Sequence, residues 1–153
     1  MNNQHQSNTA VSAEYLQLRL FKLGDIDPYV FVDELEGWSL TNVKALALDP
    51  EVRIRELAAL SNMNLDAGLQ RTLCTDPAES VVLTLLSRVD PTVEMVHLIA
   101  AGPHIETRRN VARRNLMTPL LELLAEDNDT TTRELAQARL VTRGIRVDTS
   151  RVR

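Results

Sequence analysis

The chain has 153 residues, with 21 Asp and Glu against 17 Lys and Arg, so its formal net charge is −4. Five Gly, six Pro and five aromatic residues are too few for the turns and aromatic runs of an all-β sandwich. The apolar stretches fall short of the roughly 18 residues that a membrane span needs, and the single cysteine excludes a disulfide framework. A lone cysteine fits a reducing compartment, so we expect a cytoplasmic protein without membrane contact.

The N-terminal part divides into a tail and a helical segment. Residues 1–12 are polar and lack periodicity, which predicts a disordered tail. Residues 13–37 carry leucines at helical spacing, with Gly24 and Gly37 as helix-ending residues and Asp27-Pro28 as a helix start. We expect these two short helices to cap one end of the domain.

An Asp-Pro pair recurs along the chain as a helix-start signal. Asp accepts hydrogen bonds from the free amides of a first turn, and Pro is tolerated there because its missing N–H has no partner in any case. The intervals between the pairs hold two to four helical turns, which predicts an all-α chain of many short helices. The pairs are Asp49-Pro50, Asp76-Pro77 and Asp90-Pro91.

The sequence also repeats itself at about 26 residues. Residues 46–49 align with 73–76 and 99–102 at offsets of 27 and 26, and Asp129 lies a further 27 residues on. A single helix pair cannot cover its own apolar face, so consecutive pairs must stack. We therefore expect about four helix pairs over residues 38–143, followed by a basic tail, 144–153. The expected core positions are Leu57, Leu73, Leu85, Ile99, Val111 and Leu135.

Two segments of the repeat resemble a known family. Asn115-Leu-Met-Thr-Pro119 and the stretch from Asn62 to Asp76, with Leu73 and Cys74, resemble leucine-rich-variant repeats, which belong to the HEAT-like α-solenoids. The resemblance covers about residues 35–141. It implies a right-handed α-solenoid, with residues 13–143 as a single domain, used mainly for binding.

No catalytic or metal-binding arrangement is visible. Cys74 occupies the repeat position of Ala47 and Ala100, which indicates a small packing residue, and no histidine is spaced to act as its base. The histidines, His5, His97 and His104, lack the spacing of metal ligands, and no glycine-rich phosphate loop exists. We expect no enzyme activity, no catalytic residue, no metal and no cofactor.

Arginine is the residue type that points to binding. Arg108, Arg109, Arg113 and Arg114 stand within one nine-residue segment, and like charges four residues apart, as at 109 and 113, repel by about 0.2–0.5 kcal/mol. Stacking brings Arg55, Arg108 and Arg133 to equivalent positions. These arginines either pair with the chain's own carboxylates as a solvated surface or form a site for an anion or an acidic partner. Trp38 either packs between helices or anchors a partner.

Charge is unevenly distributed, with a net −7 over residues 1–102 and +3 over residues 103–153. We expect a non-enzymatic protein-interaction module that binds a protein or peptide on its helical-repeat surface. The alternative is a nucleic-acid-associated protein that uses its arginine-rich C-terminal repeats, which the net negative charge and the scarcity of aromatic residues disfavour. Contact between the acidic front of one copy and the basic rear of another would give a homo-oligomer.

Overall fold

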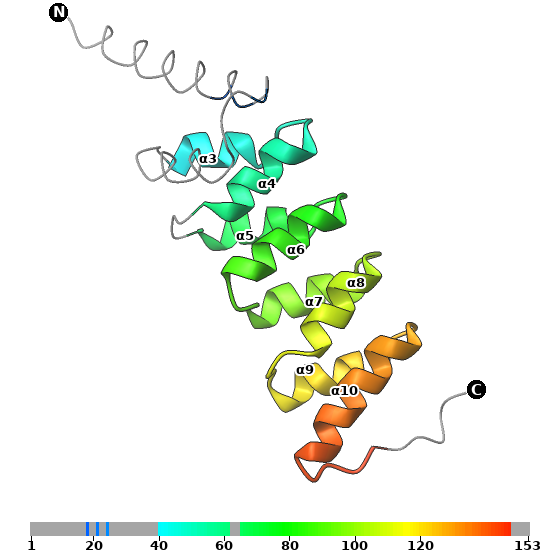
Figure 1. Ribbon diagram of the computed structural model, residues 1–153. Helices are drawn as coiled ribbons and strands as arrows, with labels where there is room; N and C mark the ends of the chain where they lie inside the picture. The colour runs from blue at the N-terminus through cyan, green and yellow to red at the C-terminus, as the bar shows by residue number, and fades with distance from the viewer. Residues whose placement is uncertain (1–17, 19–20, 22–23, 25–39, 62–64, 148–153) are drawn as a thin grey trace, which may run out of the picture. The chain divides into compact units, whose positions relative to one another are not determined.

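A computed structural model describes residues 18, 21, 24, 40–61 and 65–147 (Figure 1). Within this part of the chain every regular element is an α-helix, which confirms the all-α class. The helices are α3 (Leu40–Leu46), α4 (Val52–Leu60), α5 (Ala67–Cys74), α6 (Glu79–Arg88), α7 (Val93–Ala101), α8 (Ile105–Ala112), α9 (Thr118–Leu124) and α10 (Thr130–Thr142). None of them is long and apolar enough to cross a membrane.

Several predictions from the sequence fall on residues that lie outside this description. They concern the tail 1–12, most of the capping segment 13–37, Trp38 and residues 148–153. Gly24 is described, and its φ of +81° is the left-handed conformation expected there.

The chain forms two compact units, Met1–Leu69 and Gln70–Arg153, and the division falls inside α5. In the first unit α3 packs against α4. The core between them is aliphatic, because the apolar residues of both helices recur at helical spacing and leave the polar ones outside. Its buried members include Val43, Leu46, Ala47, Ile54, Leu57 and Ala58.

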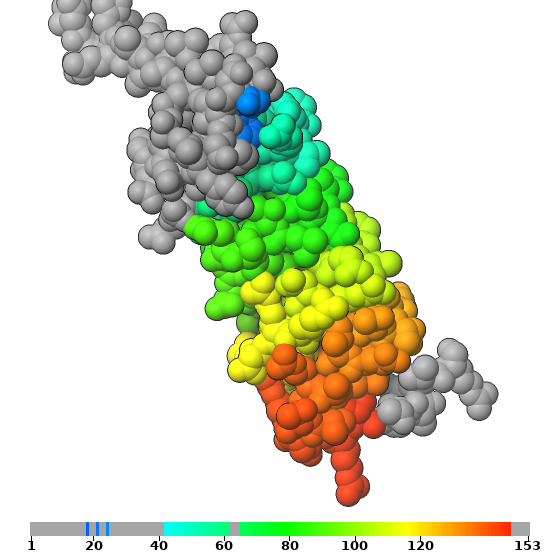
Figure 2. Space-filling model, in the orientation of Figure 1, coloured from blue at the N-terminus to red at the C-terminus, as the bar shows by residue number. Residues whose placement is uncertain are grey.

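In the second unit, alternate helices pack against each other. α6 contacts α8 and α8 contacts α10, while α7 contacts α9, and α8 also touches α7 and α9. The green, yellow and orange segments therefore follow one another in chain order (Figures 1 and 2). The buried side chains between the helices include Val82, Leu85, Met95, Val96, Ile99, Val111, Leu120, Leu121 and Leu124.

The turns before α6, α8 and α10 lie at one edge of this unit, which we call the first edge. The turns after these helices lie at the opposite edge, which we call the second edge (Figure 1). Side-chain contacts support this parallel arrangement. Arg109 of α8 reaches Asp129, which precedes α10, while Arg114 just after α8 reaches Leu86 near the end of α6.

The helices begin two or three residues later than the Asp-Pro pairs predict. The N-caps of α4 and α6 are Glu51 and Ala78, and neither side chain makes a capping hydrogen bond. Instead, Oδ1 of Asp49 accepts from the amide of Glu51 at 2.9 Å, and Oδ1 of Asp76 accepts from that of Ala78 at 2.8 Å. These aspartates shape the turn that leads into the helix, because an Asp side chain readily accepts from the amide two residues on.

A turn of the same type precedes α10, and it shows that the predicted alignment of the fourth helix pair is wrong by two residues. Oδ1 of Asp127 accepts from the amide of Asp129 at 2.8 Å, so Asp127 is the counterpart of Asp49 and Asp76. Asp129 is instead the N-cap of α10 and accepts from the amide of Thr132 at 2.8 Å. The offset from Gly102 to its counterpart is thus 25 residues rather than 27.

The last described helix ends as the sequence predicts. Gly144 has a φ of +75°, its amide donates to the carbonyl of Val141, and the amide of Ile145 donates to that of Leu140. This pair of bonds is a Schellman motif, in which glycine adopts the left-handed conformation without steric cost.

Five of the six expected core residues are buried, and one is not. Leu57, Leu73, Leu85, Ile99 and Val111 expose at most 3% of their surface. Leu135 is only half-buried, and its neighbour Ala136 is buried in its place. No described helix follows α10, the last helix of residues 40–61 and 65–147.

Candidate interaction surface

Three arginines at equivalent positions hold the turns that precede their own helices. In each case Nη1 donates to the carbonyl oxygen of the residue six positions earlier. A guanidinium group thereby satisfies a carbonyl that no helix pairs. The pairs are Arg55 with Asp49 at 2.9 Å, Arg108 with Gly102 at 2.8 Å and Arg133 with Asp127 at 2.7 Å.

Arg108 is the most deeply buried of the predicted site residues. Only 8% of its surface is exposed. Its Nε forms an ion pair with Oδ2 of Asp127 at 2.8 Å. Both side chains are almost enclosed, at 10% and 6% exposure. Removing one partner of such a pair costs about 3–5 kcal/mol, because it leaves an uncompensated buried charge. Arg108 therefore joins α8 to the turn before α10.

Arg109 makes a second ion pair across the same turn. Its Nε and Nη2 donate to the two carboxylate oxygens of Asp129 at 2.9 and 2.8 Å, and its Nη1 donates to Oε1 of Glu106 at 2.5 Å. Asp129 also accepts from the hydroxyl and the amide of Thr132. The bond from Arg109 is the main reason that the pKa of Asp129 lies well below its usual value. The pKa of Arg109 is raised in turn, mainly by its hydrogen bond to Asp129.

Arg113 and Arg114 lie at the second edge, away from Arg108 and Arg109. Arg114 donates to the carbonyl of Leu86 and forms a 3.4 Å ion pair with Asp90. Arg113 is exposed, and its side chain has no partner within the described part of the chain. The four clustered arginines of the sequence are therefore divided between two opposite edges.

The predicted arginines therefore fall into two groups. Arg55, Arg108 and Arg133 bind carbonyls in the turns before their own helices, and Arg109 binds the carboxylate of Asp129, the N-cap of α10. Arg113 and Arg114 belong to the other group. Of the two alternatives for these arginines, Arg108 and Arg109 follow the first, since they pair with the chain's own carboxylates, Asp127 and Asp129. Binding of a partner by the seven predicted residues stays a prediction.

Three further arginines, outside the predicted set of site residues, lie at the second edge. Arg88 stands in the last turn of α6, Arg139 in the last turn of α10, and Arg143 is the C-cap of α10; all three are exposed. Arg139 donates to the carbonyl of Arg113, and Arg143 donates to Oδ1 of Asn115 at 2.5 Å. Positions 88, 114 and 139 are 26 and 25 residues apart, so the repeat spacing itself was the signal.

We call the five arginines of the second edge the arginine ridge. They gather where three parallel helices end, and helix C-termini favour positive charge because of the macrodipole. The first edge is mixed in charge: the side chains of Arg108, Arg109 and Arg133 lie there together with six carboxylates, those of Asp76, Glu79, Glu106, Glu126, Asp127 and Asp129. The members of the arginine ridge are Arg88, Arg113, Arg114, Arg139 and Arg143.

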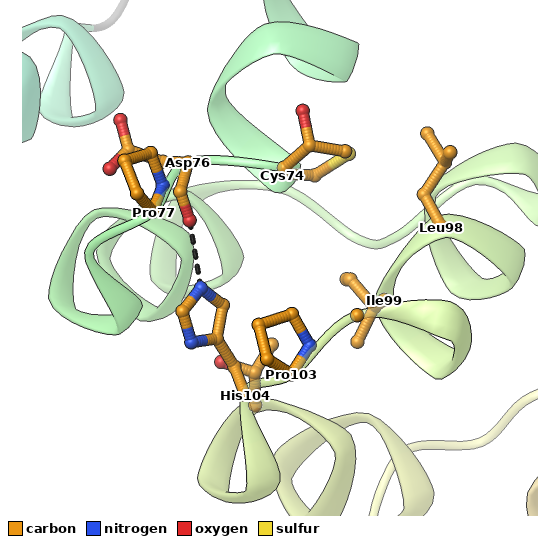
Figure 3. A pocket seen from close by; sticks show the side chains of 10 residues that line it. Cys74, Asp76, Pro77, Leu98, Ile99, Pro103 and His104 are labelled. Atoms are coloured by element: carbon orange, nitrogen blue, oxygen red, sulfur yellow. Dashed lines mark hydrogen bonds between the residues drawn. The ribbon is translucent and has the colours of Figure 1, made fainter.

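Two contacts join neighbouring turns at the first edge. Oε1 of Glu79 accepts from the amide of Thr107 at 2.9 Å and from its hydroxyl at 3.2 Å. Nε2 of His104 lies 2.8 Å from the carbonyl oxygen of Asp76 (Figure 3). Because His104, the N-cap of α8, makes no side-chain cap, Glu79 supplies from α6 the acceptor that the first turn of α8 needs.

A pocket of about 110 Å³ lies between these two turns. Cys74, Leu98, Ile99 and Pro103 contribute to its wall (Figure 3). The Cys74 thiol is 3% exposed, donates to the carbonyl of Arg71 at 3.3 Å, and has its pKa raised to about 11, chiefly by burial. It is therefore protonated at neutral pH and is a weak nucleophile. This confirms the prediction of a buried packing residue.

No family model, no curated protein and no solved structure matches this chain. Across residues 40–61 and 65–147, no three His, Cys, Asp or Glu side chains are placed to hold a metal ion together.

Proposed function

We propose that the chain is a non-enzymatic protein-interaction module built as a right-handed α-solenoid of about four helix pairs. The observation that carries this proposal is the packing of alternate helices, α6 on α8 on α10 and α7 on α9. In such a stack each pair contacts its neighbours and presents a long surface made of equivalent helix faces, which is the surface that repeat proteins use for binding.

Recurrent turn contacts support the same proposal. The bond from an arginine to the carbonyl six residues earlier occurs at Arg55, Arg108 and Arg133. The aspartate that accepts from the amide two residues on occurs at Asp49, Asp76 and Asp127. Identical contacts at spacings of 25 to 27 residues, or multiples of them, are typical of a repeated supersecondary unit.

Hydrogen exchange of the full chain with a purified partner tests the proposal. The partner is recovered on immobilised protein, identified, purified and added back to the free chain. Binding to the helical-repeat surface predicts slower exchange in two or more of α6, α8 and α10. Protection confined to residues outside α3–α10 would contradict the proposal.

The alternative is association with nucleic acid through the arginine-rich C-terminal helices. The observation that favours it is the arginine ridge, since guanidinium groups bind phosphate as well as carboxylate. Electrophoretic retention of a duplex DNA of about 20 base pairs across a salt titration tests it. A nucleic-acid function predicts retention that falls steeply with salt.

A further inference from the structure

The arginine ridge carries positive charge that the described residues leave largely without a carboxylate partner. Arg88 and Arg113 are exposed and have no side-chain partner within residues 40–61 and 65–147. Arg139 and Arg143 are exposed too, and the groups that they contact are neutral: the carbonyl of Arg113 for the former, Asn115 and Thr118 for the latter. The one carboxylate that the described residues bring onto the ridge is Asp90, paired with Arg114.

The ridge is continuous across three helices. Arg114 touches the end of α6 through the carbonyls of Leu86 and Val89, and Arg139 touches the end of α8. Neighbouring helices lie about 8–10 Å apart, so the guanidinium groups of α6, α8 and α10 spread over roughly 20 Å. An extended peptide rises about 3.3 Å per residue, so a carboxylate at every third residue would meet each helix end in turn.

The residue types of this unit favour carboxylates on a protein over the phosphates of a nucleic acid. Residues 70–153 contain no lysine and no Phe, Tyr or Trp, so this unit lacks the aromatic platforms on which proteins that bind single strands stack successive bases. Their twelve arginines face eleven carboxylates, a formal charge of only +1, whereas duplex binders use about 6–10 phosphate contacts. Arg109 binds the carboxylate of Asp129 through two hydrogen bonds, which shows how an arginine of this unit binds a carboxylate.

We propose that the arginine ridge is the docking surface for an acidic segment of a partner protein, whose Asp and Glu side chains pair with Arg88, Arg113, Arg139 and Arg143. This proposal rests on the proposed function, because it names the surface and the partner chemistry of the same interaction module. It moves the binding site away from Arg108 and Arg109, which the turns before α8 and α10 already occupy.

Fluorescence anisotropy with two labelled probes tests the proposal on the full chain. One probe is a peptide of about thirteen residues with Glu at every third position and Ser or Gly between them. The other is a duplex DNA of about 20 base pairs. The variant is Arg88→Gln with Arg113→Gln, which removes two exposed charges and no described side-chain contact. Its charge-matched control is Lys44→Gln with Arg53→Gln, on exposed residues of the first unit; it also removes the ion pair of Lys44 with Asp66 and the contact of Arg53 with the Phe21 ring, so its melting temperature is measured as well.

We expect the peptide to bind the wild-type chain at low salt more tightly than the duplex does. The ridge variant should weaken peptide binding at least about tenfold, or about 1.4 kcal/mol, while the control variant changes it less than about twofold. Equal melting temperatures of the ridge variant and the wild type verify that the fold is intact. Absence of peptide binding, equal losses in both variants, or tighter binding of the duplex would overturn the proposal.

Failure of this proposal is distinguishable from failure of the proposed function. The ridge variant is also added to the hydrogen-exchange experiment with the purified partner. If the partner still protects the helices of the ridge variant as it protects the wild type, the module binds elsewhere and only the ridge assignment is wrong. If the partner protects no helix even of the wild type, the interaction module itself is wrong.

Discussion

At the scale of single residues, the Cys74 thiol shows how burial decides reactivity. The thiol lies among Leu98, Ile99 and Pro103, and its pKa of about 11 leaves almost no thiolate at neutral pH. We predict that a thiol reagent such as a nitrobenzoate disulfide modifies native Cys74 at pH 7.5 at least about a hundredfold more slowly than the urea-unfolded chain. Equal rates for the two states would show that the thiol is accessible. Glutathione at the same pH serves as the reference thiol.

The ion pair of Arg109 and Asp129 gives a prediction for acid stability. The pKa of Asp129 is lowered in the folded chain, so its stabilising contribution is complete above the unfolded pKa of about 3.9 and is lost as pH falls toward the lower folded value. Asp129→Asn keeps a good N-cap residue and removes the charge. The stability gap between wild type and variant should therefore be widest above about pH 5 and should shrink below pH 4.

Urea midpoints at pH 7, 5, 4 and 3 measure that gap. Glu122→Gln serves as the control, since Glu122 is exposed and its side chain has no partner among the described residues. The control should leave the pH profile of the wild type unchanged. A gap between wild type and Asp129→Asn that stays constant from pH 7 to 3 would contradict the assigned role of the Asp129 charge.

The positions of the arginines could be predicted from the sequence, but the carboxylates that pair with them could not. The repeat alignment placed Arg55, Arg108 and Arg133 at equivalent positions, and all three make the same turn contact. The carboxylates that neutralise Arg108 and Arg109 lie about twenty residues further along the chain. Their proximity depends on how the next helix pair stacks, and no local pattern encodes that geometry.

At the scale of helices, the capping of α8 depends on its neighbour. Glu79 belongs to the first turn of α6, yet it accepts from the amide and hydroxyl of Thr107 in α8. Asp76 and Glu79 have the three-residue spacing of a local capping box. Asp76 serves Ala78 instead, and Glu79 is left to reach the next helix pair.

We predict that Glu79→Ala destabilises the chain by about 0.5–2 kcal/mol, the usual cost of losing an N-terminal cap. For a chain of this size each kcal/mol lowers the melting temperature by about 2–4 °C. Melting followed by far-UV circular dichroism measures the change, and Glu122→Ala on α9 is the matched control. Equal melting temperatures of Glu79→Ala and wild type would show that water replaces the cap without loss.

Helix existence was predictable from the sequence, and helix starts were less so. Apolar spacing identified the helices and five of six core positions, because burial imposes a periodicity that reads directly from one chain. The predicted start of α4 was too early, because the Asp49 side chain accepts a hydrogen bond from the amide of Glu51 and the helix begins only after Glu51. Leu135 was misplaced by one position, since Ala136 is the buried residue of that turn of α10 and Leu135 is half-buried.

At the scale of the whole chain, the division inside α5 bears on cooperativity. The sequence predicts one domain over residues 13–143, and the structure forms units that meet between Leu69 and Gln70. α5 has eight residues, and an isolated helix shorter than about 12–15 residues is marginal in water. Unfolding of either unit would leave the other with a fragment of a helix, so we expect the chain to unfold in one transition.

Two matched core truncations test this expectation. Leu57 is 1% exposed in the first unit and Leu124 is fully buried in the second. Replacing either leucine by alanine should cost about 2–5 kcal/mol, since the removed side chain leaves a cavity. If the chain unfolds as a single domain, Leu57→Ala and Leu124→Ala each shift the same single transition to lower temperature, without splitting it, in calorimetry and in far-UV circular dichroism. Two separate transitions, of which each variant moves only one, would show that the units unfold independently.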